Sequence, residues 1–240
     1  MKMRLDKYLS DFTELTRSQA KKAIREGRVS VNEEISSRGD CKIAAEDRVK
    51  LDGQVIKEQR YQYIMLNKPA GLVSATCDDR NETVVEYIKG AADGRTSFFA
   101  KDLFPMGRLD KDTEGLLIIT NDGEMAHRLL SPKNHVAKKY FVRLDKEIDE
   151  TDVEKMSDGI DIGEKHRTKP AKLEILSPEE CYLTITEGKF HQIKRMFAAL
   201  GKKVIYLKRV EMGGLGLDDC LEPGEWRFLT AEEIKRLKGE

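Results

Sequence analysis

Gly107-Arg108-Leu109-Asp110-Lys111-Asp112-Thr113-Glu114-Gly115-Leu116-Leu117-Ile118-Ile119-Thr120-Asn121-Asp122-Gly123 is the stretch on which the interpretation of this 240-residue chain rests. The apolar run 116–119 is rich in β-branched residues and ends at Asn-Asp-Gly, which is typical of a buried strand followed by a turn. A loop with two carboxylates, Asp110 and Asp112, precedes this strand. A buried strand would hold the loop against a rigid sheet, which suits a carboxylate that takes part in catalysis.

A calcium-binding loop is one alternative for the same residues. Asp110, Asp112, Glu114 and Gly115 fall on positions 1, 3, 5 and 6 of such a loop. Position 12 is Asn121, where a bidentate Glu is required. The mismatch disfavours calcium, so no metal site is predicted.

A solvated acidic turn is the second alternative, and Arg108 argues against it. This arginine lies beside Asp110, between an apolar pair and the predicted strand. A guanidinium close to a half-buried carboxylate favours its charged form, and a charged carboxylate can serve as a nucleophile. The pattern therefore favours a catalytic carboxylate.

The same stretch closely resembles the signature of the RsuA-like pseudouridine synthases. In that family Gly-Arg-Leu-Asp, a Thr three residues on, a Gly and an apolar run surround the catalytic aspartate, and each position is matched here. The resemblance implies that Asp110 is the catalytic residue and that Arg108 helps to bind the target nucleotide. It also implies a reaction without a cofactor, because isomerising uridine needs neither a redox group nor an energy source.

Charge and cysteine content narrow the class of protein. Lys+Arg and Asp+Glu are both 43, so net charge says nothing about partners, but residues 188–210 hold seven basic and no acidic side chains. Such local basic surfaces suit an anionic polymer. The four cysteines are widely separated, and no apolar stretch is long enough to span a bilayer. We expect a cytoplasmic protein that does not contact a membrane.

The amino-terminal segment contains a helix with a basic face. Thr16 and Gln19 form a capping box and Gly27 supplies a stop, so a helix is predicted over 17–26. Basic residues recur along one stripe of this helix without interleaved acids, which suggests an anionic partner. Apolar residues at helical spacing over 5–12 predict a second helix, and short strands are predicted at 29–31 and 48–51.

This segment resembles the S4 RNA-binding domain, through Met3-Arg4-Leu5-Asp6-Lys7-Tyr8-Leu9 and the motifs at 16–20 and 27–32. We therefore predict an S4-like domain over 1–58 and a catalytic domain over 59–240, joined by a polar linker at 53–60. The resemblance places the RNA contact on Arg17, Ser18, Lys21, Lys22, Arg25 and Arg28.

Two further motifs of the catalytic domain match the synthase family. Asn67-Lys68-Pro69-Ala70-Gly71 corresponds to a run that borders the family's active site. The strand predicted over 138–144 matches a Lys-x-Tyr strand, which makes Tyr140 the residue that stacks on the target base, although core packing is the commoner role of a strand tyrosine. Lys133, Lys138, Lys139 and Arg143 have no acidic residue near them in sequence and should form a basic surface.

A helix is predicted near 190–200, with Phe190, Ile193, Met196, Phe197 and Leu200 on its apolar face. In the family, the basic residue after Gln-Ile pairs with the catalytic aspartate, and Lys194 takes that place here. Basic residues of this segment and of the following strand should extend the RNA surface. The members predicted to bind RNA in the catalytic domain are Lys138, Lys139, His191 and Arg195, while Lys202, Lys203, Lys208 and Arg209 continue the basic surface.

The implied fold is α+β, an S4-like module followed by a synthase domain with a mixed, mainly antiparallel sheet and flanking helices. The expected function is site-specific conversion of uridine to pseudouridine in 16S ribosomal RNA by a monomer, on a flipped-out uridine and within a partly assembled subunit. The absence of a long basic tail favours the small subunit. Alternatives are a 23S-specific synthase, an inactive ribosome-assembly factor, and a metal-dependent phosphohydrolase using Asp110 and Asp112. An intact Asp110, Tyr140 and Lys194 argues against the inactive factor.

Overall fold

A computed structural model describes residues 3–13, 15–44, 46–56, 61–91 and 102–239. They form two compact units that separate between Gln62 and Tyr63. The boundary predicted at residue 58 falls within 57–60, outside the described residues, and stays a prediction. The linker predicted from residue 53 is wrong in its first part, because Gln54–Val55 forms strand β6, paired with β5. Within the described ranges no helix has the length and apolar character needed to cross a bilayer.

The first unit is built on two helices, α1 (Leu5–Phe12) and α2 (Arg17–Arg25). The predicted capping box is confirmed: the Gln19 amide donates to Thr16 Oγ1 over 3.3 Å, and the Thr16 amide donates to Gln19 Oε1 over 2.8 Å. Both helices bury their apolar faces in one core with the small sheet. The strands pair as β3-β2-β5-β6 and β1-β4; they are β1 (Met3–Arg4), β2 (Val29–Val31), β3 (Glu34–Ile35), β4 (Lys42–Ile43), β5 (Val49–Leu51) and β6.

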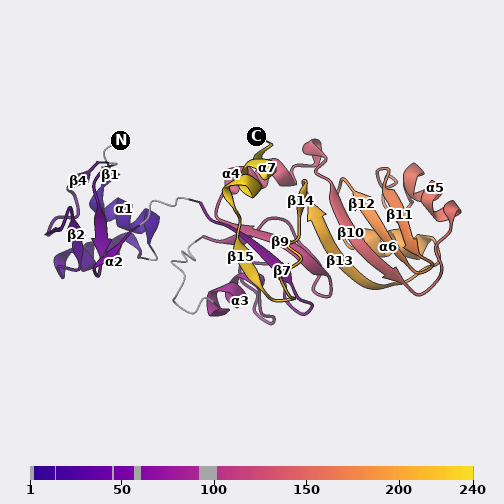
Figure 1. The fold of residues 1–240 in the computed structure, drawn as a ribbon, viewed down its shortest axis with the longest axis horizontal. Coiled ribbons are helices and arrows are strands. Elements are labelled where there is room, and N and C mark those ends of the chain that lie inside the picture. Colours follow the sequence, from indigo (N-terminus) through magenta and orange to yellow (C-terminus); the bar gives the residue numbers. More distant parts are fainter. Residues whose placement is uncertain (1–2, 14, 45, 57–60, 92–101, 240) are drawn as a thin grey trace. The chain divides into compact units, whose positions relative to one another are not determined.

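A nine-stranded sheet forms the second unit (Figure 1). Seven strands run in the order β11-β12-β10-β13-β9-β7-β15, while β14 pairs with β13 and β8 pairs with β9. Strands β13 and β9 are parallel and the other pairs are antiparallel, so the predicted mixed, mainly antiparallel sheet is confirmed. The strands are β7 (Tyr63–Lys68), β8 (Phe104–Pro105), β9 (Glu114–Thr120), β10 (Lys138–Leu144), β11 (Lys172–Ser177), β12 (Glu180–Ile185), β13 (Val204–Met212), β14 (Leu215–Gly216) and β15 (Trp226–Phe228).

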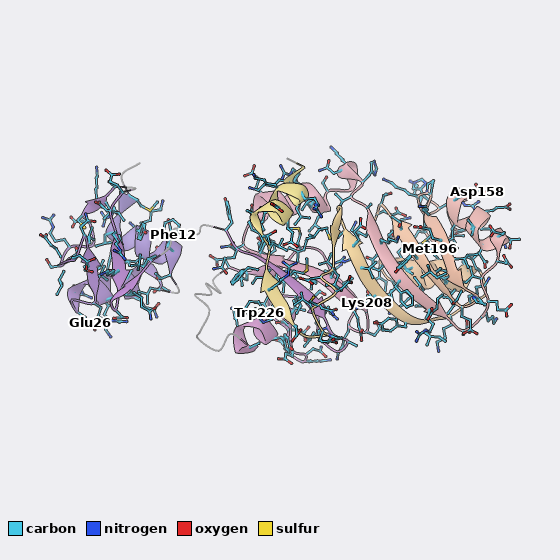
Figure 2. All side chains as sticks on the ribbon, viewed as in Figure 1. Phe12, Glu26, Asp158, Met196, Lys208 and Trp226 are labelled. Atoms are coloured by element: carbon cyan, nitrogen blue, oxygen red, sulfur yellow. The ribbon has the colours of Figure 1, made fainter. Side chains whose placement is uncertain are left out.

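Helices flank this sheet. In the described part of the unit they are α3 (Val84–Ala91), α4 (Gly123–Leu130), α5 (Glu150–Asp158), α6 (Gln192–Ala199) and α7 (Ala231–Lys238), with a short 3-10 turn at Pro132–Asn134. Helix α5 packs beside β11 (Figure 1), and α6 contacts β13. Met196 of α6, which Figure 2 labels, is fully buried. The central strands β7 and β9 are the most buried part of the sheet and provide a rigid base for the loops at their ends.

The predicted basic surface on β10 is not free of acids. Residues 144–180 hold more acidic than basic side chains, and they contain β11 and lead into β12, which lies beside β10. Lys139 Nζ lies 3.4 Å from Glu174, and Arg143 Nη2 lies 2.8 Å from Glu180. The strand pairing thus brings acids far away in sequence next to these basic residues.

Candidate active site

The loop that carries Asp110 connects β8 to β9 and is fixed along its backbone. Ser74 Oγ donates to the Leu109 carbonyl over 2.9 Å and accepts from the Leu109 amide over 3.1 Å. The Gly71 amide donates to the Lys111 carbonyl over 2.7 Å. The residues on both sides of Asp110 are therefore held in place, so the position of its carboxylate depends mainly on its own side-chain torsions.

Lys68 supports the same loop from within the protein. Its side chain is fully buried, and Nζ donates to the carbonyls of Pro69, Lys111 and Thr113 over 3.0, 3.2 and 2.9 Å. Burial lowers the pKa of Lys68 to about 8, while the nearby carboxylates act in the opposite direction. The three carbonyls satisfy all three N–H donors of an ammonium group. The motif at 67–71 was predicted to border the site; the structure shows that its lysine anchors the loop.

Asp110 lies in a small cluster of charged groups. Its Oδ2 is 3.3 Å from Lys194 Nζ, and its Oδ1 is 3.6 Å from His191 Nε2. Lys194 also donates to Asp112 Oδ1 over 2.6 Å, and this hydrogen bond lowers the pKa of Asp112. The Asp110 side chain keeps 29% of its surface exposed, so a substrate can reach it. The structure brings together the first turn of α6 and the loop before β9, two segments far apart in sequence.

Arg108 and Tyr140 make no hydrogen bond or ion pair with this cluster within the described residues. Arg108 is exposed and forms neither a hydrogen bond nor an ion pair within the described residues, so the cations next to Asp110 are Lys194 and, when protonated, His191. Tyr140 is 7% exposed on β10, and no hydrogen bond joins it to Asp110 in the described part of the chain. Their roles in binding the nucleotide stay predictions.

Three neighbouring strands place Gly115, Arg209 and Tyr140 in one row. Arg209 was predicted to be part of the exposed basic surface, and this is wrong: it is 1% exposed and Nε donates to the Leu116 carbonyl over 2.7 Å. Burial lowers the pKa of nearby Lys138, and the charge of Arg209 lowers it further. Two buried or half-buried cations thus lie at the centre of the sheet, beside Tyr140. Sequence periodicity alone could not show that the arginine faces inward.

The start of α6 also differs from its predicted pattern. The helix begins at Gln192, after His191, whose φ of 47° is left-handed. Phe190 was predicted to join the buried apolar face, but it precedes the helix and is 72% exposed. Arg195 donates to Glu164 over 2.7 Å and to the Phe190 carbonyl over 3.1 Å. Its predicted RNA contact would have to compete with these interactions.

In the first unit, Asp6 organises several basic residues. Its carboxylate is fully buried and lies 2.8 Å from Arg4 Nη2, 3.4 Å from Arg17 Nη2 and 4.0 Å from Lys21 Nζ. Hydrogen bonding to Arg4 is the main reason that the pKa of Asp6 falls to about 2. One buried charge thus fixes the arrangement of three more exposed cations.

The other predicted RNA contacts of this unit either line a pocket or form ion pairs. A pocket of about 490 Å³ is lined by Arg4, Asp6, Ser18, Lys21, Arg25, Ser37, Arg38, Gly39 and Asp40. Lys22 lies 3.7 Å from Glu26, and Arg28 lies 2.6 Å from Asp52. The basic stripe predicted along Arg17, Lys21, Arg25 and Arg28 is therefore not free of acids. Arg17 and Lys21 face Asp6, and Arg28 faces Asp52.

The two units match two known families. The RNA pseudouridylate synthase family matches residues 62–199, and the S4 domain family matches residues 3–38. This chain belongs to the RNA pseudouridine synthases. The synthase is 44% identical to ribosomal small subunit pseudouridine synthase A of Haemophilus influenzae, with 98% of this chain and 99% of that protein covered. The corresponding protein of Escherichia coli is 41% identical, with 97% and 98% covered.

A crystal structure of a pseudouridylate synthase has the same overall fold. It aligns with the synthase at a TM-score of 0.68 and 43% identity, covering 98% of this chain and 99% of the other. The region matched by the catalytic family contains Asp110, Tyr140 and Lys194, whereas β13 and Arg209 lie beyond it. The S4 match contains Asp6 and its basic neighbours, so this cluster belongs to an RNA-binding domain.

Lys194→Met is expected to lower the single-turnover rate of pseudouridine formation at least about tenfold, or about 1.4 kcal/mol. The substitution removes the ammonium that lies 3.3 Å from Asp110. Lys111→Met is the matched control, because Lys111 is exposed on the same loop and its Nζ donates to Asn81 over 2.7 Å instead of to a carboxylate. Equal loss of rate in both variants would show that the pair between Lys194 and Asp110 has no special importance.

Proposed function

We propose that the synthase converts a specific uridine of small-subunit ribosomal RNA to pseudouridine, with Asp110 as the carboxylate that acts on the ribose. The observation that carries this proposal is the partly exposed Asp110 carboxylate next to Lys194, on a loop anchored by Lys68. The small-subunit target is supported by the two relatives named for that activity, which align over nearly the whole chain.

The reaction is an isomerisation and needs no second substrate. The bond between C1′ and N1 breaks, the uracil turns while bound, and a bond forms between C1′ and C5. The proton lost from C5 is balanced by the proton gained at N1. Asp110 either attacks C1′, forming an ester, or assists removal of a proton from the ribose; both routes require a charged carboxylate. Lys194 Nζ lies 3.3 Å from Asp110 Oδ2, close enough to attract a charged carboxylate.

The target base must leave its stack to reach Asp110, at a cost of a few kcal/mol. Stacking on an aromatic side chain can offset this cost. We propose that Tyr140 provides this surface and accepts the proton from C5, after a local movement that exposes more of its ring. Arg108 is exposed and without a partner among the described residues, so its guanidinium is free to contact the displaced nucleotide or its phosphate.

In this proposal the S4 unit binds the ribosomal RNA through contacts of its own, separate from those at Asp110. The cations around Asp6 and the pocket beside them would contact phosphates, which position a protein without reading sequence. The residues around Asp110 and the folded shape of the RNA would then determine which uridine is modified. A partly assembled small subunit presents such a shape more fully than free RNA.

The proposal is tested by incubating the synthase with free 16S RNA, free 23S RNA and partly assembled small-subunit particles, and by mapping pseudouridine in each. We expect one modified position, confined to the small-subunit RNA. Modification of 23S RNA alone would contradict the proposed target. Tight binding to the particles with no pseudouridine in any substrate would instead favour the inactive assembly factor.

A further inference from the structure

Phe190 is an exposed aromatic residue next to the reactive carboxylate. It is 72% exposed although it lies in an otherwise apolar motif. Its neighbour His191 has Nε2 3.6 Å from Asp110 Oδ1. A single exposed apolar side chain needs no explanation by itself. The position of this one, one residue from a side chain that contacts Asp110, makes its surroundings informative.

The Phe190 ring is stacked on the His191 imidazole. The ring centroids are 3.8 Å apart and the planes are inclined by 19°, so one face of Phe190 is covered by His191. The high exposure of Phe190 leaves the rest of the ring accessible. The two rings therefore form a short stack that extends from Asp110 towards solvent.

The backbone under this stack is held by several hydrogen bonds. The Phe190 carbonyl accepts from Arg195 Nη1 over 3.1 Å, and the Lys189 amide donates to Gln192 Oε1 over 2.9 Å. Lys189 Nζ also lies 3.3 Å from Glu164. The aromatic surface is thus ordered before any ligand arrives, which reduces the entropy that binding must remove.

The charges around the stack indicate what would bind there. Lys194 and His191 flank Asp110, and Arg108 is exposed without an ion-pair partner among the described residues. Lys194 is shared with Asp110 and Asp112, so the exposed Arg108 is the cation left for a further anion. An exposed aromatic ring near such a cation fits a nucleobase with its attached phosphate, because each base has a face that stacks and each phosphate attracts a cation. A purely apolar peptide would gain nothing from the basic surroundings.

We propose that Phe190 is the stacking surface for a nucleobase adjacent to the target uridine, which keeps the RNA strand in place while the uridine reaches Asp110. This inference rests on the proposed function, because the target uridine defines the neighbouring base. Phe190 would then be a binding residue, and the chemical step would not depend on it. Stacking on an aromatic side chain is sequence-tolerant, so the subsite would favour any unpaired base, with purines giving the larger overlap.

The test measures RNA binding and single-turnover rate for the variants Phe190→Ala and Phe190→Trp and for the control Leu176→Ala. The substrate is an RNA fragment that contains the target uridine. Leu176 is 50% exposed on the edge strand β11, four strands away from β9 in the sheet order. Phe190→Ala is expected to weaken RNA binding about tenfold to a hundredfold, with the single-turnover rate at saturating enzyme within about threefold. Phe190→Trp should bind at least as well as the wild type, and Leu176→Ala should change neither quantity.

Abasic substitutions at each position flanking the uridine identify the stacked base. In the wild type, one of these substitutions should weaken binding as much as Phe190→Ala does, and it should have little further effect in the variant, since both changes remove the same contact. Additive effects at every flanking position would overturn the proposal, and so would unchanged binding by Phe190→Ala.

Binding is measured separately from turnover, so the two proposals fail in different ways. If the wild type formed no pseudouridine but Phe190→Ala weakened binding with the expected dependence on one base, the proposed reaction would fail and the stacking surface would stand. If turnover were normal and binding did not depend on Phe190, the reaction would stand and the stacking surface would fail.

Discussion

Asp110→Asn is expected to reduce pseudouridine formation by at least about 10⁴-fold, which corresponds to more than about 5 kcal/mol of transition-state stabilisation. The amide has nearly the same shape as the carboxylate but carries no charge, and it is a poor nucleophile towards the ribose. The loop should be unaffected, because its hydrogen bonds to Ser74, Gly71 and Lys68 all involve backbone atoms of other residues. A single-turnover tritium-release assay measures the loss.

Asp112→Asn is the matched control for this prediction. Asp112 lies on the same loop and shares Lys194 with Asp110, but it is mostly exposed. The control should lose less than about tenfold in rate, because the substitution leaves Lys194 next to Asp110. RNA affinity should stay close to that of the wild type in both variants. Turnover by Asp110→Asn within about tenfold of wild type would show that another group performs the chemical step.

Gly115→Ala is expected to destabilise the second unit by about 3–6 kcal/mol, the sum of backbone strain and steric overlap. Gly115 has a φ of 98°, a backbone angle that residues other than glycine rarely adopt. A Cβ atom there would lie 2.8 Å from the Arg209 amide nitrogen and closer still to its carbonyl oxygen, where β9 runs parallel to β13. Strands β9 and β13 cannot move apart without disturbing the row formed by Gly115, Arg209 and Tyr140. Thermal unfolding should shift downward by more than about 6 °C for a domain of this size.

Gly71→Ala separates the two contributions. Gly71 has a φ of 99°, almost the same as Gly115, but no atom lies within 4 Å of the position that its Cβ would take. This variant should therefore lose only the strain contribution, about 1–3 kcal/mol. Similar melting temperatures for the two variants would mean that the close approach of β9 and β13 does not restrict which amino acid can occupy position 115.

Local signals in the sequence were sufficient for most of the elements around the site. The capping box at Thr16 and Gln19, the alternation over 138–144 and the β-branched run before Asn121 each describe their own segment, and the structure contains the corresponding helix and strands. The carboxylate loop and the lysine of α6 were singled out by the family motifs. The structure adds the distance of 3.3 Å between Asp110 and Lys194.

Features that depend on contacts between distant segments were not predictable in this way. Arg209 is buried because β13 lies between β9 and β10, and Glu174 lies near Lys139 because β11 and β12 extend the sheet beside β10. Lys68 anchors the loop that carries Asp110 by donating to backbone carbonyls. Every residue has a backbone carbonyl, so the sequence does not show which ones a lysine will contact. Phe190 fitted an apolar helical spacing, but a left-handed residue before the helix turns it outward.

Some elements were missed although their sequences contain a recognisable signal. Helix α5 begins with a capping box of Asp149 and Asp152, and α7 begins with one of Thr230 and Glu233. Both follow the same pattern as the capping box of α2. The overall acidity of residues 144–180 does not indicate the first of these helices, because charge content says little about secondary structure.

The role of Asp110 and the small-subunit target are tested together by a map of pseudouridines in ribosomal RNA from three kinds of cell: those with the wild-type synthase, those without it, and those with the Asp110→Asn form. One pseudouridine of the small-subunit RNA should disappear when the gene is removed, return with the wild-type protein, and stay absent with Asp110→Asn. An unchanged small-subunit map, or a site restored by Asp110→Asn, would contradict the proposed function.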